Sequence, residues 1–285
     1  MKKIYLNIKI IVQILFVITF LSTQPAKSLD KFDKGDSISD YFYGLLSFNE
    51  NQYEESFEFL RKLDGLEISH ADYSVKYLYS LINSRNVREA FNYSKKLEKK
   101  NLANFESYLV TGVFYLKNSN LDLAKKYLFK AKNMNSSSIL NYYVSSSLYN
   151  WASVTGLNSS QASLELKKLD DRFENLKKIQ NVFLKCFFNS PDTENFFETL
   201  ISNQKVDFSR YNYFYASYLV SLGRIDEAKQ VINSSLKYYP RNLLLNQFKI
   251  DLYNNNKSNI FMFDCKNEQH VSAEILYITA NALSS

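Results

Sequence analysis

The residue types that most often carry catalysis or bind metal are few in this chain and far apart. It has two histidines, His70 and His270, and two cysteines, Cys186 and Cys265. A zinc site needs such ligands at short spacings, and a nucleophilic triad needs a histidine placed by an acidic partner beside a serine or cysteine. The sequence offers neither pattern. We therefore expect no catalytic residue, no metal site and no cofactor.

Two further features also argue against an enzyme. The adjacent carboxylates Asp170 and Asp171 lie in an expected helix, where successive side chains point about 100° apart, so they cannot act as an acid–base pair. The six glycines are too widely spaced to form a phosphate-binding loop, a dinucleotide fingerprint or a nucleophile elbow. Several large enzyme classes are thus excluded, and a non-enzymatic protein is favoured.

The low content of turn-forming residues predicts an all-α fold. The 285 residues include six Gly and three Pro, whereas average usage is about 7% and 5%. Because sheets need turn residues at short intervals, a chain this poor in both is expected to be nearly all helical. Four of the six net positive charges belong to Lys2, Lys3, Lys9 and Lys27. The remainder is close to neutral and gives no electrostatic reason to expect nucleic acid as a partner.

Residues 1–28 have the three parts of a secretory signal peptide. Lysines open the segment, an apolar stretch covers residues 10–21, and the small residues Ala26 and Ser28 stand at the expected cleavage site. We expect cleavage after Ser28 and a mature protein in the periplasm. An uncleaved inner-membrane anchor is the alternative, but Asn7 and Lys9 leave the apolar stretch shorter than the roughly 20 residues that a membrane-spanning helix needs.

Export would bring the two cysteines into an oxidising compartment. Cys186 and Cys265 are far apart in the sequence and lie on different expected elements. A bridge between them is possible, although buried single thiols are the more common outcome. The pairing stays open at this point.

A 34-residue period is the strongest pattern in the sequence. Around Gly112 stand Tyr108 and Tyr115, and Ala124 and Ala131 follow. The pattern recurs one and two periods earlier, and again three periods and two residues later. It resembles the tetratricopeptide repeat, a 34-residue helix–turn–helix with small residues where its helices touch. The expected packing residues are Gly44, Ser56, Leu78, Ala90, Gly112, Ala124, Ala131, Ala216, Gly223, Ala228 and Pro240.

The resemblance implies an all-α superhelix, an α-solenoid of about six helix pairs plus a closing helix, over 37–255. Residues 29–36 and 256–270 would be linkers. The segment 271–285 is interpreted as a cap, or as the first helix of a further repeat with no second helix behind it. Exported tetratricopeptide proteins of alphaproteobacteria look similar over 210–245 and 272–283 and continue through further repeats, which favours a chain that is part of a longer protein.

The middle of the chain lacks the small-residue pattern, so its helices are assigned from apolar spacing alone. A first helix is expected over 139–154 and one long second helix over 163–179. Another first helix is expected over 181–188. The following helix is expected to start at Ser190, with Pro191 in its first turn.

In tetratricopeptide proteins, the first helices of the repeats line a concave face that binds partners. The matching positions here are apolar and aromatic, which departs from members that clamp a carboxylate with Lys, Arg and Asn. Such a face suits an amphipathic helix or an extended apolar peptide. Alternatively, these side chains belong to the core, the more frequent role of an apolar stripe. The expected partner-binding residues are Tyr41, Leu45, Phe48, Val75, Tyr79, Leu109, Val113, Leu116, Tyr213 and Ser217, with Ile82 and Val220 beside them.

The expected function is a non-enzymatic protein–protein interaction scaffold of the bacterial cell envelope. Two alternatives remain open. The repeats could be the N-terminal targeting half of a longer enzyme or regulator, or a membrane-anchored scaffold that self-associates through the end near Ser272. The sequence identifies neither the partner nor the envelope process.

Overall fold

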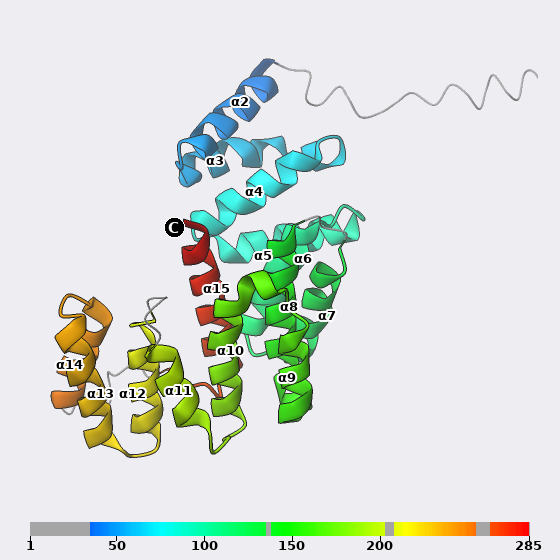
Figure 1. Ribbon diagram of the computed structural model, residues 1–285. Coiled ribbons are helices and arrows are strands. Elements are labelled where there is room, and N and C mark those ends of the chain that lie inside the picture. Colours follow the sequence, from blue (N-terminus) through cyan, green and yellow to red (C-terminus); the bar gives the residue numbers. More distant parts are fainter. Residues whose placement is uncertain (1–34, 135–137, 203–207, 255–262, 285) are drawn as a thin grey trace, which may run out of the picture. The chain divides into compact units, whose positions relative to one another are not determined.

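The computed structural model describes residues 35–134, 138–202, 208–254 and 263–284. Within these ranges the chain consists of helices and turns, without a β-strand (Figure 1). It divides into two compact units, residues 1–86 and 87–285. The expected signal peptide, residues 1–28, lies outside the described residues. None of the described helices is long and apolar enough to cross a membrane.

From Gly35 onward the first unit contains three helices, and two short 3₁₀ turns at Arg61–Leu63 and Leu66–Ile68 separate the last two. Gly44 and Ser56 bring the first two helices together, because the Ser56 hydroxyl donates a hydrogen bond of 2.9 Å to the Gly44 carbonyl. The core of the unit includes Leu60, Leu63, Tyr73, Leu78 and Leu81, all buried. The helices are α2 (Gly35–Asn49), α3 (Tyr53–Leu60) and α4 (Ala71–Asn83).

The second unit continues with helices that pack mainly on their neighbours in the sequence, as in α6 with α7, α7 with α8 and α12 with α13. This all-α arrangement of stacked helix pairs confirms the fold class predicted from the repeat pattern. The helices are α5 (Val87–Lys99), α6 (Phe105–Lys117), α7 (Leu121–Lys132), α8 (Ile139–Ser153), α9 (Ser159–Lys167), α10 (Glu174–Phe187), α11 (Thr193–Ile201), α12 (Tyr211–Ser221), α13 (Ile225–Tyr238), α14 (Leu243–Tyr253) and α15 (Glu268–Ser284).

Small residues lie where the helices of a pair meet. Gly112 of α6 faces the buried Leu128 of α7, and a Cβ atom added to this glycine would come within 2.7 Å of the Leu128 Cγ. Among the expected packing residues, Gly223 and Pro240 are exposed in turns. The other nine are buried: Gly44, Ser56, Leu78, Ala90, Gly112, Ala124, Ala131, Ala216 and Ala228.

The turns that end four first helices share one backbone geometry. Asn51, Arg85, Ser119 and Gly223 all have positive φ, between 58° and 78°. In each turn, this residue and the one after it donate amide hydrogen bonds back to the end of the helix, as from Gly223 to the Val220 carbonyl at 2.9 Å. This is the Schellman arrangement. The four residues recur with the spacing of the sequence period, so the repeat also governs the turns.

The expectation of one long helix over 163–179 is wrong. The helix α9 ends at Lys167, and α10 begins at Glu174 after a 3₁₀ turn. The cause is local: the Asp170 carboxylate accepts the Arg172 amide at 2.9 Å and pairs with its guanidinium at 2.7 Å. Such side-chain bonds to the backbone compete with helix continuation. The helix expected over 181–188 is therefore the second half of α10, and α11 starts at Thr193 rather than at Ser190.

The last described helix does not extend the stack beyond α14. Instead, α15 returns to pack against α8 and α10 (Figure 1). It begins at Glu268, inside the segment expected to be a linker. Val271 and Ile275 on its inner face are fully buried. The apolar face that the sequence left without a partner is thus covered by the chain itself, as a cap would be.

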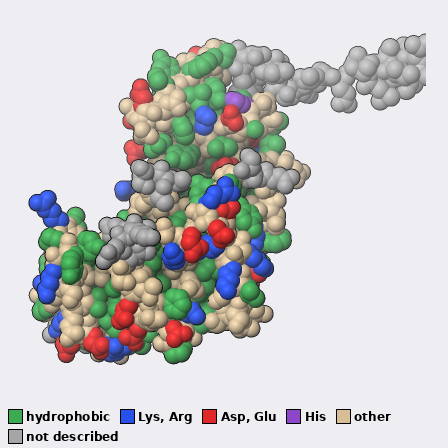
Figure 2. All heavy atoms as spheres, in the orientation of Figure 1, with side chains coloured by type: hydrophobic (Ala, Val, Ile, Leu, Met, Phe, Trp, Pro, Cys, Tyr) green, Lys and Arg blue, Asp and Glu red, His purple; other side chains and the backbone are tan. Residues whose placement is uncertain are grey.

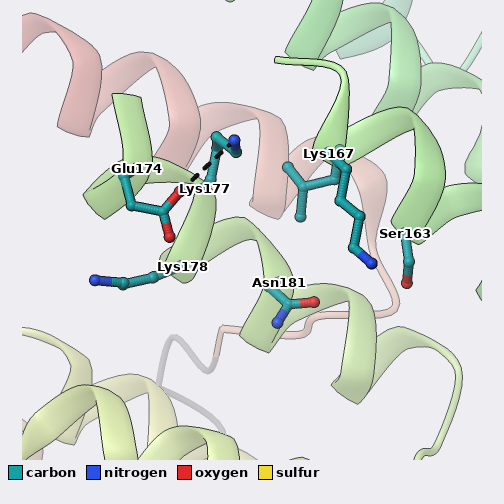
Figure 3. A pocket seen from close by; sticks show the side chains of 7 residues that line it. Ser163, Lys167, Glu174, Lys177, Lys178 and Asn181 are labelled. Atoms are coloured by element: carbon teal, nitrogen blue, oxygen red, sulfur yellow. Dashed lines mark ion pairs between the residues drawn. The ribbon is translucent and has the colours of Figure 1, made fainter. Parts of the chain in front are cut away.

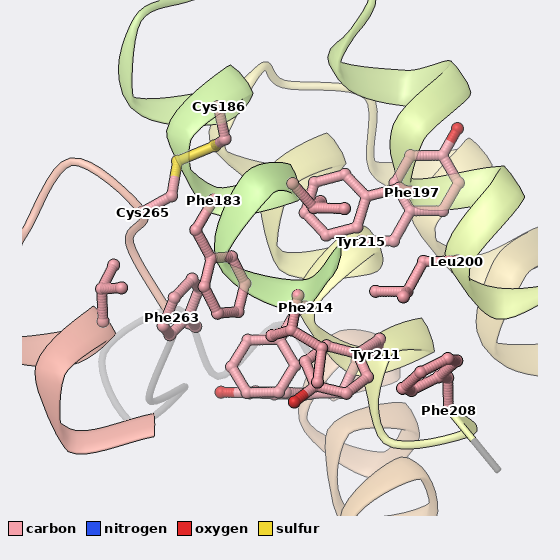
Figure 4. Packing of buried hydrophobic residues seen from close by; sticks show 14 of the residues in the cluster. Phe183, Cys186, Phe197, Leu200, Phe208, Tyr211, Phe214, Tyr215, Phe263 and Cys265 are labelled. Atoms are coloured by element: carbon pink, nitrogen blue, oxygen red, sulfur yellow. A yellow bond between two sulfur atoms is a disulfide. The ribbon is translucent and has the colours of Figure 1, made fainter. Parts of the chain in front are cut away.

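A disulfide joins Cys186 of α10 to Cys265, three residues before α15 (Figure 4). Its Cα atoms are 6.0 Å apart, within the usual range for a bridge. The sequence left this pairing open, and the structure joins the two cysteines. Next to the bridge, Phe263 lies between Phe183 of α10 and Phe214 of α12, with ring centroids 4.8 Å and 4.5 Å away.

Candidate functional site

The first unit brings three aromatic rings together at one end of α2 and α4. We call Phe48, Tyr53 and Tyr79 the aromatic cluster. Its centroids are 5.3 Å apart for Phe48 and Tyr79 and 5.7 Å for Tyr53 and Tyr79. The Lys76 ammonium lies 5.8 Å from the Phe48 ring. Half of the Tyr79 surface (50%) is exposed, so the cluster offers an aromatic surface to a partner.

The other three expected partner-binding residues of this unit, Tyr41, Leu45 and Val75, are half-buried. The Tyr41 hydroxyl is hydrogen-bonded to His70 Nε2. Burial and the charge of Asp72 raise the pKa of Tyr41, so this hydroxyl stays protonated at neutral pH. On the face shown in Figure 2, hydrophobic side chains reach the surface of the first unit among few charged ones.

In the second unit, three of the five expected partner-binding residues are buried: Leu116, Tyr213 and Ser217. Leu116 on α6 is only 3% exposed and packs in a cluster with Leu148 of α8. Leu109 and Val113 pack against the same cluster, as does Leu276 of α15. At Leu116 the expectation of an open face is not met, because this residue packs with Leu148 of α8. Leu109 and Val113 are half-buried, as Tyr41 and Leu45 are.

The same correction applies on α12. Tyr213 is 5% exposed, and Ser217 is fully buried. The ring of Tyr213 meets the ring of Phe248 on α14 edge-on, with centroids 4.9 Å apart. These residues belong to the core in this structure, the alternative role that the sequence left open.

Polar contacts hold α15 on the first helices. Glu274, 5% exposed, accepts two hydrogen bonds from the Arg210 guanidinium, at 3.0 Å and 2.9 Å, and one from the Tyr211 hydroxyl at 3.3 Å. The same guanidinium lies 4.2 Å from the ring centroid of Tyr277. Near the start of α15, the Gln269 amide donates to the Ser119 hydroxyl at 2.6 Å. We call Arg210, Tyr211 and Glu274 the polar latch.

The environment of the polar latch favours the charged form of Arg210. Burial alone would lower the pKa of Arg210, but the hydrogen bonds and charge of Glu274 outweigh this effect and raise it. Burial and the Glu274 carboxylate hold the pKa of Tyr211 well above its usual value. Within the latch, Arg210 and Tyr211 bind a carboxylate carried by a helix, that of Glu274 on α15. The sequence analysis did not identify these residues. The signal that could have found them is Glu274, a charged residue within the apolar stripe of Val271 and Ile278.

A separate cleft lies between α9 and α10 and has a volume of about 220 Å³. Lys167, Lys178, Ser163 and Asn181 line it (Figure 3). Lys177 lines it too, but its ammonium pairs with Asp171 at 2.6 Å. The Glu174 carboxylate lines the same cleft, so side chains of both charges surround it. Among the described residues, no group of three or more His, Cys, Asp or Glu side chains could hold a metal ion.

Two features define this chain as a helical-repeat protein. Its helix pairs share a periodic contact between small residues, and its first helices hold a further helix. Residues 209–242, which include α12 and α13, match the family model of the tetratricopeptide repeat. Such repeats generally mediate protein–protein interactions, and the fold is typically a scaffold rather than a catalyst.

Among solved structures, the chain is similar to a chain in "Structure of Naa15/Naa10 bound to HypK-THB". The TM-score is 0.36 and the sequence identity 13%, with 78% of this chain and 34% of that chain covered. This chain thus spans about a third of the length of that relative. A comparison with curated proteins found no match.

Proposed function

We propose that this protein is a non-enzymatic scaffold that binds a peptide or protein partner on the face formed by its first helices. The observation that carries the proposal is the position of α15, a helix seated on α8 and α10 and fastened to the start of α12. A surface that holds a helix of its own chain has the shape and chemistry to hold a helix.

The first unit offers an accessible surface of its own on its first helices, α2 and α4. The aromatic cluster combines rigid apolar area with hydroxyl groups, a combination that is enriched where proteins bind one another. Ile82, 38% exposed, extends the apolar surface one turn beyond Tyr79 on α4. A partner that fits is an amphipathic helix or an extended apolar peptide.

The experiment compares three forms of the purified protein as bait for envelope extracts. In Tyr79→Asp, a charge on the exposed ring position should abolish capture of a partner while the helical circular dichroism is retained. Phe129→Asp is the matched control, because Phe129 is equally exposed (52%) but lies on the second helix α7. A partner that binds all three forms equally, or a Tyr79→Asp chain that is unfolded, would contradict the proposal.

The proposed place of action is the periplasm, on the strength of the leader-like residues 1–28. Cell fractionation with mass spectrometry of the mature amino terminus tests this. A terminus at Leu29 in the periplasmic fraction is the expected result. An intact leader in the membrane fraction would favour the anchored alternative.

A second candidate function is self-association, and one observation favours it. The helix α2 exposes Phe42 (65%), Tyr43 and Leu46 on one side, and large apolar side chains so exposed often mark an interface. The end near Ser272 is less suited to this role, since Ser272 is buried. Sedimentation of the wild type and of Phe42→Asp decides: a dimer that the substitution dissociates supports the idea, and a wild-type monomer at high concentration excludes it.

A further inference from the structure

The position of α15 relative to the repeat order is the starting point. The helix α15 contacts α8 and α10, the turn after α6 and the start of α12. These elements lie on the first-helix side of successive helix pairs. The helix α15 makes these contacts from the far end of the sequence. In a stack of repeats, by contrast, each helix contacts mainly its neighbours. It therefore occupies the surface on which a repeat protein holds a ligand.

The inner face of α15 has the composition of an interface rather than of a core helix. Val271, Ile275 and Ile278 are buried with spacings of four and three residues, so they form one stripe. Between them stands Glu274, whose buried carboxylate depends on Arg210. The buried hydroxyl of Ser272 makes no hydrogen bond within the described residues. A buried ion pair adds selectivity more than stability, since apolar side chains of similar size would pack at least as well.

The disulfide limits how far α15 can move if it leaves this surface. Cys265 is three residues from Glu268, and Cys186 is in α10, one of the helices on which α15 lies. A tether this short gives the released helix a high effective concentration at its site, on the order of millimolar. A competing helix must overcome that concentration, so the bridge sets a threshold for competition.

We propose that the surface of α8, α10 and the start of α12 is a helix-binding site, that α15 is its intramolecular occupant, and that a partner helix of the same pattern replaces α15. The partner helix carries apolar side chains spaced as Val271, Ile275 and Ile278, and a carboxylate at the place of Glu274 that pairs with Arg210. This inference deepens the proposed function and rests on it in taking first helices as the binding face.

The first experiment uses the full chain and a fluorescent peptide of residues 268–284 as the probe. Glu274→Gln in the chain weakens its own α15 and leaves Arg210 free to bind the glutamate of the peptide. We expect this variant to bind the probe at least ten-fold more tightly than the wild type. A probe that itself carries Glu274→Gln should lose most of this gain. Glu227→Gln is the matched control, because it also removes a partner of an arginine, Arg224, but on α13.

Three results would overturn the proposal. The first is equal probe binding by wild type, Glu274→Gln and Glu227→Gln. The second is equal binding of a scrambled peptide. The third comes from hydrogen exchange of the unmodified protein, which needs no variant to fold: α15 should exchange faster than α8 through a local opening, and equal protection of the two helices would show that α15 is part of the permanent core.

The outcome is separable from the test of the proposed function. Tyr79→Asp alters the first unit and is expected to leave probe binding unchanged. Loss of partner capture in Tyr79→Asp with no probe binding would preserve the scaffold and reject the exchange of α15. If the probe binds as expected but the first unit captures no specific partner, the exchange of α15 is supported and the scaffold function of the first unit is rejected.

Discussion

Replacement of Gly112 by alanine tests the contact on which the repeat depends. On an open helix surface, Gly→Ala stabilises by about 1 kcal/mol. Here the new Cβ would lie 2.7 Å from Leu128 Cγ, 2.8 Å from its Cδ2 and 3.2 Å from its backbone nitrogen. Relaxed carbon contacts are about 3.5–4.0 Å. Because Leu128 is buried and its backbone cannot rotate away, α6 and α7 must separate, at an overpacking cost of up to about 3 kcal/mol.

We therefore expect Gly112→Ala to lower the free energy of unfolding by about 2 kcal/mol. Urea denaturation followed by the fluorescence of Trp151, the single tryptophan, measures it. Gly156→Ala is the control, since no atom lies within 4 Å of its added Cβ, and should change stability by less than about 0.5 kcal/mol. In a Leu128→Ala background the cost of Gly112→Ala should vanish. A gain of about 1 kcal/mol in the wild-type background, the value of helix propensity alone, would refute the contact.

Four further outcomes are expected. Burial would raise the pKa of Glu98, but hydrogen bonds from Lys130, Lys95 and Tyr127 lower it to about 2. The stability that the ionised Glu98 contributes above pH 4.5 is therefore lost as the pH falls towards 2. Glu98→Gln should reduce this acid-induced loss, measured as the free energy of unfolding against pH, by about 1 kcal/mol after allowance for solvent screening. Gln180→Leu leaves Tyr143 and Trp151 without their buried hydrogen bonds and should cost about 2–4 kcal/mol in urea. Arg85→Gly relieves an exposed left-handed residue and should stabilise the protein by about 1 kcal/mol, which a higher melting temperature would show. Cys265→Ser opens a loop of 79 residues and should cost up to about 4 kcal/mol, a loss that a reductant reproduces in the wild type.

The sequence predicted those parts of the fold that depend on contacts within a repeat or between adjacent repeats. Gly112 and Ala124 mark the contact of a helix pair because only small side chains fit there, and the period of the pattern gives the order of the helices. The left-handed turn residues Arg85 and Ser119 were missed, since neither is the glycine that usually signals this geometry. Their spacing from Gly223 contained the information.

The remaining errors have two physical causes. The end of α9 depends on one side chain, Asp170, which bonds to its own backbone, and apolar spacing carries no trace of such a bond. The burial of Tyr213 and Ser217, like the pairing of Cys186, depends on segments far away in the chain. A periodic pattern describes local neighbours, so it identified the first helices as a binding face but not the helix that lies on it.

The return of α15 also changes how the second unit can assemble. Arrays of repeats ordinarily fold by growth from any point, because each module needs only the next. Here Gln269 contacts Lys117, a partner 152 residues earlier. Closing so long a loop is slow, and it must await synthesis of α15. The second unit is thus expected to acquire its final cooperativity only after α15 has been synthesised.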